Sequence, residues 1–460
     1  VQVQGPPPLE QRREMAKLCQ ALCCCVCGFV LMAAAGLGAA ALIVQCAYIW
    51  QYDIEEMAYM PGNYQRIKVQ SAIIDALKTN NWDAVEQGLT ENNFALIISD
   101  RSGVRWEVSR GWISADAKYA IASQSKVIAA LAIYRLMQRN STLLTPNTSA
   151  AQYIPSWPKP PAEGSAVMLR DLLAFTTGFG RLKFGQPGCA RESRTTQPSW
   201  EACTEEISKY EFAYPPGTTL QYGPWHLVIA AAMAMRAFGR DLTTEAWVRT
   251  VKEEVFVPSG LHEDPDYAGA ESWLGPEDSG NRFPDFSGGL VMSGRQWERI
   301  AHKLHWGSLL EPAWFEEFTK DHNRHVRRIV GMLGKEPKSV LGMWHYAQGE
   351  WIACDAAAEQ EVVGIQQENK ICGPEPQPRV LHSVGAFGFY VWMDLTNDYN
   401  GIFIHSWPED LVICSIISVV TVSILSLLCG GMCGCVVYRR KGADRSFLAL
   451  NSESDGPSHD

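Results

Sequence analysis

The sequence lacks three motifs, and each absence excludes a class of enzyme. It has no Gly-x-Ser-x-Gly, the turn that carries the nucleophile of α/β-hydrolases. It has no His-Glu-x-x-His, which supplies two zinc ligands in many metalloproteases, and no glycine-rich phosphate-binding loop. We therefore expect a protein that uses neither a metal nor a cofactor.

Positive charge is also scarce. The 460 residues include 40 Lys and Arg against 50 Asp and Glu, a formal charge of -10. No basic stripe with interleaved aromatic residues offsets this balance, so nucleic acid is not expected as a partner. The length allows one large or two ordinary domains with accessory segments.

Two long uncharged runs stand near the ends of the chain, at 18–52 and 411–438. Each exceeds the roughly 20 apolar residues that span a bilayer. Basic residues precede the first run and follow the second, while acidic residues follow the first run and precede the second. This distribution of charge predicts that both termini are cytoplasmic. A cleaved signal peptide is the alternative for the first run. Either interpretation places the region between the runs outside the cytoplasm.

These runs predict a two-pass membrane protein with five segments. They are a cytoplasmic N-terminus (1–17), a transmembrane signal anchor (18–52), an extracytoplasmic domain (53–410), a second transmembrane helix (411–438) and a cytoplasmic tail (439–460).

Four cysteines fall between the runs, an even number that suits an oxidising compartment: Cys189, Cys203, Cys354 and Cys372. Proximity in sequence favours Cys189–Cys203 and Cys354–Cys372, although three pairings are possible. Two Asn-x-Ser/Thr sequons, at Asn140 and Asn147, share one polar loop and predict glycosylation.

Strand patterns stand at both ends of the central region and helical patterns between them. The predicted strands are 94–99, 104–109, 388–395 and 401–405. The predicted helices are 127–139, 169–175, 225–238, 244–255 and 295–303. We therefore expect an α/β (α+β) domain in which both ends build one antiparallel sheet around a helical insertion.

A Ser-x-x-Lys pair stands at the start of an otherwise apolar helix, in IASQSKVIAALAIYRLMQ. Residues three apart share a helix face, which brings the Lys126 amine close to the Ser123 hydroxyl and allows it to take the serine's proton. The alternative is a capping serine beside a lysine whose amine reaches solvent. A second copy, Ser156 to Lys159, lies among prolines that prevent a helix.

This segment and those after it resemble the serine β-lactamase-like superfamily, in its class C β-lactamase, D-Ala-D-Ala carboxypeptidase and related esterase branch. The matching stretches are IASQSKVIAALAIYRLMQ, YIPSWP, LRDLLAFTTGFG, FAYPPGTTLQYG, FSGGLVMSGRQWERIA, LGMW and SVGAFGFYVWMD. They follow the family's order over roughly 94–405. The resemblance implies a β-lactamase/transpeptidase-like fold.

The resemblance also implies roles for three side chains. Ser123 would be the acylated nucleophile, Lys126 its activating amine and Tyr222 the partner base. The family's Tyr-x-Asn triplet is Tyr222-Gly223-Pro224 here, so the asparagine is missing. The alternative for Tyr222 is a packed aromatic residue.

The family's third motif, Lys-Thr-Gly or His-x-Gly, becomes Ser383-Val384-Gly385, with His382 one residue early. A one-residue bulge would return His382 to the site; the alternative is a surface histidine at the start of a strand. The resemblance implies that the backbone N–H groups of Ser123 and Ala386 form the oxyanion hole.

The sequence thus predicts a membrane-tethered serine hydrolase that forms an acyl-enzyme with a small-molecule or peptide ester or amide. A lapsed enzyme that keeps the fold as a binding or scaffolding ectodomain is the main alternative, because of Pro224 and Ser383. A bacterial-type cell-wall peptidase fits poorly with two spans and paired sequons. The sequence does not indicate an oligomeric state.

Overall fold

The structure, a computed structural model, describes residues 61–89, 91–157, 167–179, 199–210, 212–261, 266–267, 284–323, 326, 328–330, 345–353, 379–385 and 388–405. All of them belong to one unit, Asp53–Ser406. Both predicted membrane spans lie outside these ranges. Within the ranges, no helix combines the length and the apolarity needed to cross a bilayer.

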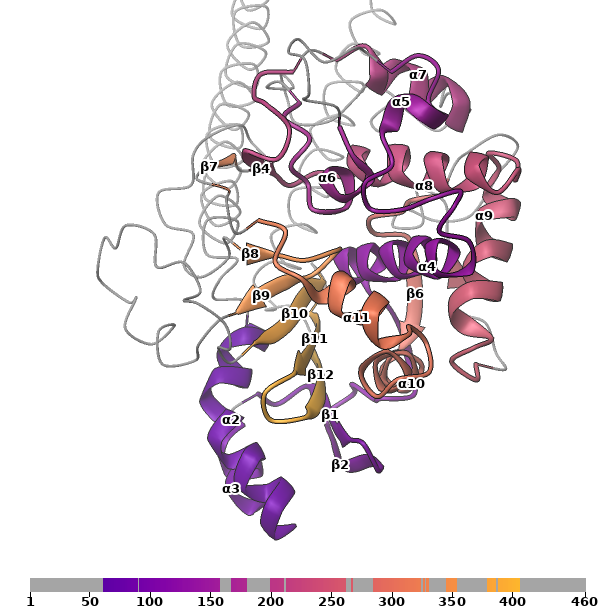
Figure 1. The fold of residues 1–460 in the computed structure, drawn as a ribbon. Helices are drawn as coiled ribbons and strands as arrows, with labels where there is room; N and C mark the ends of the chain where they lie inside the picture. Colours follow the sequence, from indigo (N-terminus) through magenta and orange to yellow (C-terminus); the bar gives the residue numbers. More distant parts are fainter. Residues whose placement is uncertain are drawn as a thin grey trace, which may run out of the picture. The chain divides into compact units, whose positions relative to one another are not determined.

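The centre of the unit is a seven-stranded antiparallel sheet in the order β2-β1-β12-β11-β10-β9-β8 (Figure 1). Its strands are β1 (Phe94–Asp100), β2 (Gly103–Arg110), β8 (His345–Tyr346), β9 (Trp351–Ala353), β10 (Val380–Gly385), β11 (Phe389–Asp394) and β12 (Tyr399–His405). Phe94 pairs with His405 and Asp100 with Tyr399, so the two ends of the domain meet at the middle of the sheet. The predicted pairing of both ends is confirmed.

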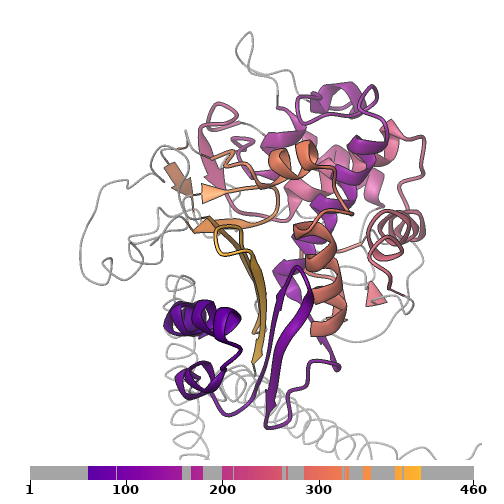
Figure 2. The same ribbon diagram turned by 60° about the horizontal axis from the view of Figure 1, so that its bottom comes forward.

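The two faces of the sheet pack against different helices. Figure 2 shows α2 (Pro61–Thr79) and α3 (Asp83–Gly88) on one face and α10 (Gly294–His305) on the other. Side chains alternate along each strand: Leu96 and Ile98 of β1 join the core beneath α2, while Ala95 and Ile97 join the larger core on the opposite face. We call the α2 side the outer face and the other the inner face.

The helical insertion packs around the buried helix α4 (Ser125–Arg139). Its other elements are η2 (Ala122–Gln124), α5 (Ala150–Tyr153), α6 (Leu169–Leu173), α7 (Trp200–Ser208), α8 (Trp225–Ala237), α9 (Thr244–Val251), the π-helical turn η4 (Lys252–Phe256) and α11 (Pro312–Thr319). All five predicted helices are present, with ends that differ by a few residues. The last turn of the predicted helix at 244–255 is η4 rather than α-helix.

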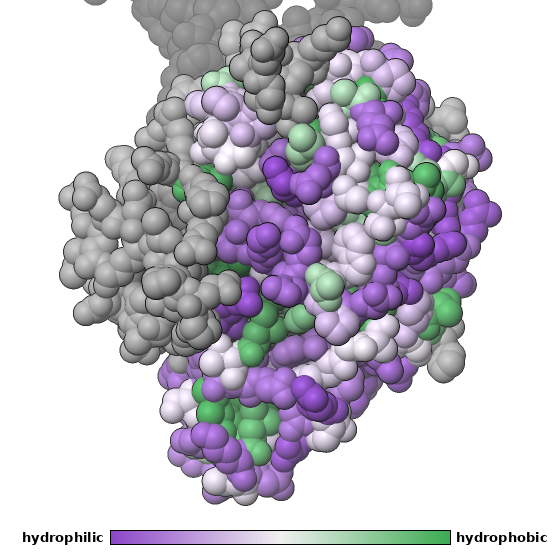
Figure 3. Space-filling model, in the orientation of Figure 1, coloured by the Kyte–Doolittle hydropathy of each residue, from purple (hydrophilic) through white to green (hydrophobic). Residues whose placement is uncertain are grey.

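Short strands join the insertion to the sheet region. β3 (Lys118–Ala120), β6 (Leu290–Ser293) and β5 (Asp266–Tyr267) form one small sheet, and β4 (Thr219–Gln221) runs parallel to β7 (Arg328–Val330). On the face shown in Figure 3, the hydrophobic residues of the described part form small separate patches. Among the described residues, large exposed apolar side chains are few: Val104, Trp112 and Val257. Most apolar side chains of this part of the chain are therefore in the two cores.

Candidate active site

Ser123 lies in the short 3-10 turn η2, directly before α4. The residue before it, Ala122, has a φ of 47°, a left-handed conformation that is unfavourable for a residue with a Cβ. Neighbouring elements hold this turn: Ile121 N donates to Leu290 O (3.0 Å), and Ser125 Oγ accepts from Leu290 N (3.1 Å). Such strain persists where the surroundings fix it, and it is common at functional sites.

Lys126 points back from the first turn of α4 toward Ser123. Its Nζ lies 3.0 Å from Ser123 Oγ and donates to Ser287 O at 2.8 Å. The lysine is 4% exposed, whereas Ser123 is half-buried and accessible. Ser287 is itself fixed, because its N and Oγ both donate to Asp285 Oδ1 (2.9 and 2.8 Å). The structure therefore brings together the two side chains that the Ser-x-x-Lys spacing predicts to meet.

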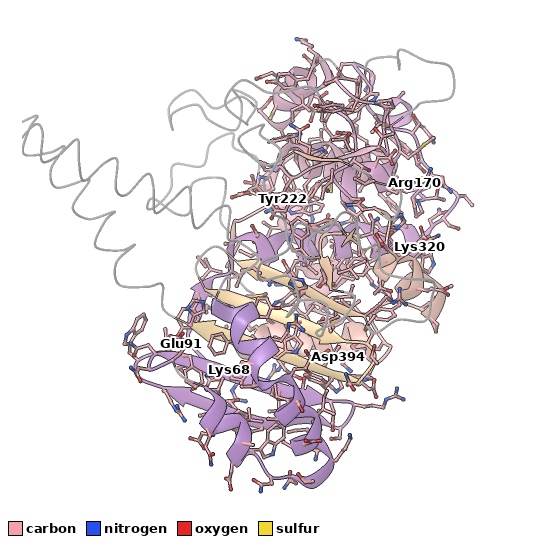
Figure 4. The ribbon with its side chains drawn as sticks, turned by 90° about the vertical axis from the view of Figure 1, so that its left-hand side faces the viewer. Lys68, Glu91, Arg170, Tyr222, Lys320 and Asp394 are labelled. Carbon is pink, nitrogen blue, oxygen red and sulfur yellow. The ribbon has the colours of Figure 1, made fainter. Side chains whose placement is uncertain are left out.

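Tyr222 follows β4 and lies where the helical part meets the sheet (Figure 4). Lys126 Nζ lies over its ring, 4.9 Å from the centroid. Phe175 packs edge-on against the ring (5.2 Å between centroids) and Trp351 stacks on it (5.6 Å, 19° between planes). The structure thus places the predicted partner base beside Lys126. Among the described residues, the contact that joins them is to the ring.

Strand β10 runs beside the nucleophile turn. A Cβ on Gly385 would come within 2.3 Å of Ile121 O, so only glycine allows this approach. The carboxamide nitrogen of Gln124 donates to Ser383 O, which ties the strand to the turn. Ser383 is buried and shares the inner face with Leu381, whose side chain joins the inner core. The predicted third-motif strand is therefore adjacent to Ser123.

His382 lies on the opposite face of β10 from Ser383. β10 pairs with β11 in unbroken register from Val380 to Gly385, so no bulge turns His382 inward. Its ring lies 5.9 Å from that of Tyr390 on the outer face, beneath α2. Burial, and then the charge of Arg66, lower the pKa of His382 to about 3. The structure does not bring His382 to Ser123, and the residue is buried rather than at the surface.

Two residues that the sequence analysis did not assign support Tyr222. Phe175 has a φ of 58° and its carbonyl accepts from Gln221 N at 2.8 Å. His226 lies 3.1 Å from Gly223 O through Nδ1 and 3.0 Å from Thr177 Oγ1 through Nε2. Burial lowers the pKa of His226 to about 3, so the ring is neutral, and Nδ1–H donates to Gly223 O. The sequence signal that could have pointed to His226 is its position four residues after Tyr222.

The β8–β9 hairpin is a third unassigned part of the site. Its turn packs on the backbone of α4, where a Cβ on Gly349 would lie 3.0 Å from Lys126 O. Glu350 is 3% exposed, Oε2 has no hydrogen-bond partner in the described part of the chain, and burial raises the pKa of the carboxyl to about 8. The hairpin carries Trp351 to Tyr222, a contact that no local pattern indicates.

Several predicted features lie partly outside the described residues. Ala386, Cys189, Cys354, Cys372 and Lys159 are outside them. Cys203 is buried in α7, and both disulfides stay predictions. Asn147 is exposed, and Asn140 is half-buried. Within the described ranges, no group of three His, Cys, Asp or Glu side chains forms a possible metal site.

The arrangement contains the parts needed for nucleophilic catalysis. A half-buried hydroxyl lies in hydrogen-bond contact with a buried amine, the geometry of a nucleophile and its base. The Ser287 carbonyl fixes the amine, and Gly385 allows β10 to approach the turn that carries the hydroxyl.

Comparison with known proteins gives a family and a fold. The Beta-lactamase family model matches residues 82–405, whereas no curated protein sequence matches the chain. Among solved structures, EstCE1, a hydrolase with promiscuous acyltransferase activity, is 14% identical over 75% of this chain and 94% of its own (TM-score 0.50). A beta-lactamase/D-alanine carboxypeptidase from Yersinia pestis is 14% identical over 68% of this chain and 86% of its own (TM-score 0.47). A penicillin-binding protein homologue from Pyrococcus abyssi is 13% identical over 76% of this chain and 77% of its own (TM-score 0.48).

The family match spans more than half of the chain and includes Ser123, Lys126 and Tyr222. The likeness to solved structures, at low identity, concerns the fold alone. The predicted β-lactamase/transpeptidase-like α/β fold with an antiparallel sheet is confirmed. The chain belongs to the Beta-lactamase family and has its serine-hydrolase fold.

Proposed function

We propose that this protein is a serine hydrolase that cleaves an ester through an acyl-enzyme on Ser123. The observation that carries the proposal is the 3.0 Å contact between Ser123 Oγ and Lys126 Nζ. A serine hydroxyl is a weak nucleophile without a base, and the Lys126 amine is the group in contact with it that can take its proton. The 2.8 Å hydrogen bond from Nζ to Ser287 O supports this role by holding the amine in place.

The reaction follows from these contacts. Ser123 Oγ attacks the ester carbonyl carbon while its proton moves to Lys126 Nζ, and the carbonyl oxygen becomes an oxyanion. The resemblance assigns the stabilisation of that oxyanion to the N–H groups of Ser123 and Ala386. The C–O bond to the alcohol then breaks, and the alcohol leaves with the proton that Lys126 Nζ has taken up; the resemblance assigns part of this transfer to Tyr222. Water cleaves the acyl-enzyme by the same proton transfers in reverse.

Two changes in the motifs favour small neutral esters over carboxylated amides. Pro224 has no N–H and no polar side chain, and Ser383 carries no charge, whereas the family has an asparagine and a cationic residue there. Losing a hydrogen bond to a charged group costs about 1.5–3 kcal/mol, and losing a neutral one about 0.5–1.5 kcal/mol. Carboxylated amides should therefore react more slowly than expected of the family by roughly tenfold to a thousandfold.

The membrane topology is also a proposal. The two uncharged runs and their flanking charges support a domain held outside the cytoplasm, with both chain ends inside.

A fluorophosphonate probe tests the mechanism. We expect covalent labelling at Ser123, located by mass spectrometry of the labelled peptide. Labelling should be abolished in Ser123→Ala and greatly slowed in Lys126→Ala. Ser156→Ala is the matched control, because Ser156 belongs to the other Ser-x-x-Lys and its Oγ accepts from Ser208 Oγ at 2.9 Å. Equal labelling of Ser123→Ala would remove the mechanism.

Substrate choice is tested with a short-chain nitrophenyl ester and a chromogenic cephalosporin. We expect measurable ester cleavage and poor cephalosporin hydrolysis, both lost in Ser123→Ala. Cephalosporin turnover that matches ester turnover would show that other residues replace the missing groups. No turnover of either would favour the lapsed enzyme, a candidate supported by Pro224, Ser383 and the contact of Lys126 with the Tyr222 ring.

A further inference from the structure

An aromatic surface lies next to Ser123 and Lys126. The indole of Trp351 stacks on the ring of Tyr222 (5.6 Å, 19°), and Tyr346 packs edge-on against the indole (4.7 Å, 81°). Tyr346 is buried, whereas Trp351 and Tyr222 are both half-buried. The stacked pair therefore exposes aromatic area beside the nucleophile, with a buried tyrosine against the indole.

The hairpin that carries Trp351 is fixed against the nucleophile helix. Gly349 has a φ of 94°, and a Cβ there would lie 3.0 Å from Lys126 O and 3.1 Å from Val127 Cα, closer than ordinary van der Waals contact. Ala347 N donates to Glu350 O (2.9 Å) and closes the turn. The indole is therefore held in a defined position relative to Lys126 without any ligand.

The distances place this surface within reach of an acyl group. An acyl chain on Ser123 Oγ begins 3.0 Å from Lys126 Nζ, and Nζ lies 4.9 Å from the centroid of the Tyr222 ring. A group two or three bonds beyond the carbonyl carbon can thus reach the ring of Tyr222, on which Trp351 stacks. Pro224, half-buried two residues after Tyr222, adds an apolar ring to the same loop.

We propose that Trp351 determines specificity by forming, with Tyr222, an apolar wall that receives an aromatic acyl group. This inference rests on the proposed function. Aromatic rings gain contact energy from stacked or edge-on neighbours, and a preformed wall binds them with little loss of side-chain freedom. The preferred substrate class among small neutral esters is accordingly an arylacyl ester.

The test varies the acyl group while the leaving group stays constant. The kcat/KM of the full-length protein is measured for nitrophenyl acetate and nitrophenyl phenylacetate. We expect a preference for phenylacetate, and Trp351→Ala should reduce the ratio of the two kcat/KM values by about 10- to 100-fold. Trp351→Phe should keep most of the preference. Trp112→Ala is the matched control, because Trp112 is 68% exposed.

A binding measurement separates this inference from the proposed function. Saturation-transfer NMR on Ser123→Ala compares methyl phenylacetate with methyl acetate, with and without Trp351→Ala. Methyl phenylacetate binding that depends on Trp351 supports the wall even if the wild type cleaves no ester. The absence of cleavage would then refute only the proposed function. The proposed wall would be refuted if Trp351→Ala reduced acetate and phenylacetate hydrolysis equally. It would also be refuted if methyl phenylacetate bound equally well with and without Trp351→Ala.

Discussion

Replacing Lys126 with methionine separates the chemistry of the site from its stability. Methionine has a similar length and keeps the apolar contacts of the stem, but it has no amine. The substitution removes the base that lies 3.0 Å from Ser123 Oγ and the donor to Ser287 O, and leaves the nucleophile in place. We therefore expect loss of activity in a folded protein.

The size of each effect follows from the contacts. A positioned general base contributes about 10²- to 10⁴-fold, so kcat/KM for an ester should fall by that factor, or about 2.7–5.5 kcal/mol. The side chain is 4% exposed, so methionine can keep its apolar contacts. The substitution leaves the Ser287 carbonyl without this donor, which costs about 1–3 kcal/mol. Stability should therefore fall by no more than about 3 kcal/mol.

The assay pairs ester hydrolysis with thermal unfolding followed by circular dichroism. Lys68→Met is the control, since Lys68 is exposed on α2 and should affect neither measurement. Full ester turnover by Lys126→Met would refute the role of the amine. Loss of activity together with a large drop in Tm would show that Lys126 acts through structure.

Three further outcomes follow from the described residues. Burial raises the pKa of Glu350 above its unfolded value of 4.5 to about 8, so its ionisation destabilises the fold increasingly as pH rises from 4.5 toward 8. Glu350→Gln should therefore raise the free energy of unfolding, and with it Tm, more at pH 9 than at pH 5, by up to a few kcal/mol; an equal effect at both pH values contradicts this. Gly385→Val should abolish activity and lower Tm, because its Cβ would meet Ile121 O at 2.3 Å, and an unchanged enzyme would show that β10 can move. In a glycosylating cell, Asn147→Gln should cause a larger loss of glycan than Asn140→Gln, seen as a larger shift in gel mobility, because Asn147 is exposed. The absence of glycan at both sites would argue against the proposed topology.

Local patterns predicted the parts of the site that depend on neighbours in sequence. The helix at Ser125–Arg139 follows from an almost unbroken apolar run, and a separation of three residues is enough to bring Lys126 to Ser123. Helix α2 could also have been found. Its buried positions Val69, Ile73 and Ala76 have helical spacing, but Arg66 interrupts the stripe. The buried Arg66 donates a hydrogen bond from Nε to the hydroxyl of Tyr390 (3.0 Å), a residue 324 positions away in the sequence.

Contacts between distant segments could not be predicted in the same way. Ser287 O holds Lys126 from 161 residues away, and no side-chain pattern identifies a backbone carbonyl as a partner. Trp351 reaches Tyr222 only because a glycine turn packs on α4. Such contacts depend on how the layers pack, so they became visible only in the structure.

The third motif shows how one residue of register decides a role. His382 and Ser383 are adjacent polar residues in an apolar strand, and alternation allows only one of them to face Ser123. The side chains around them decide which. Val380 and Val384 pack toward the outer face and Leu381 toward the inner face, and Gly385 must face inward because Ile121 O occupies the space of its Cβ. Ser383 therefore takes the inner position, so the face of the strand toward Ser123 carries a neutral hydroxyl rather than an imidazole.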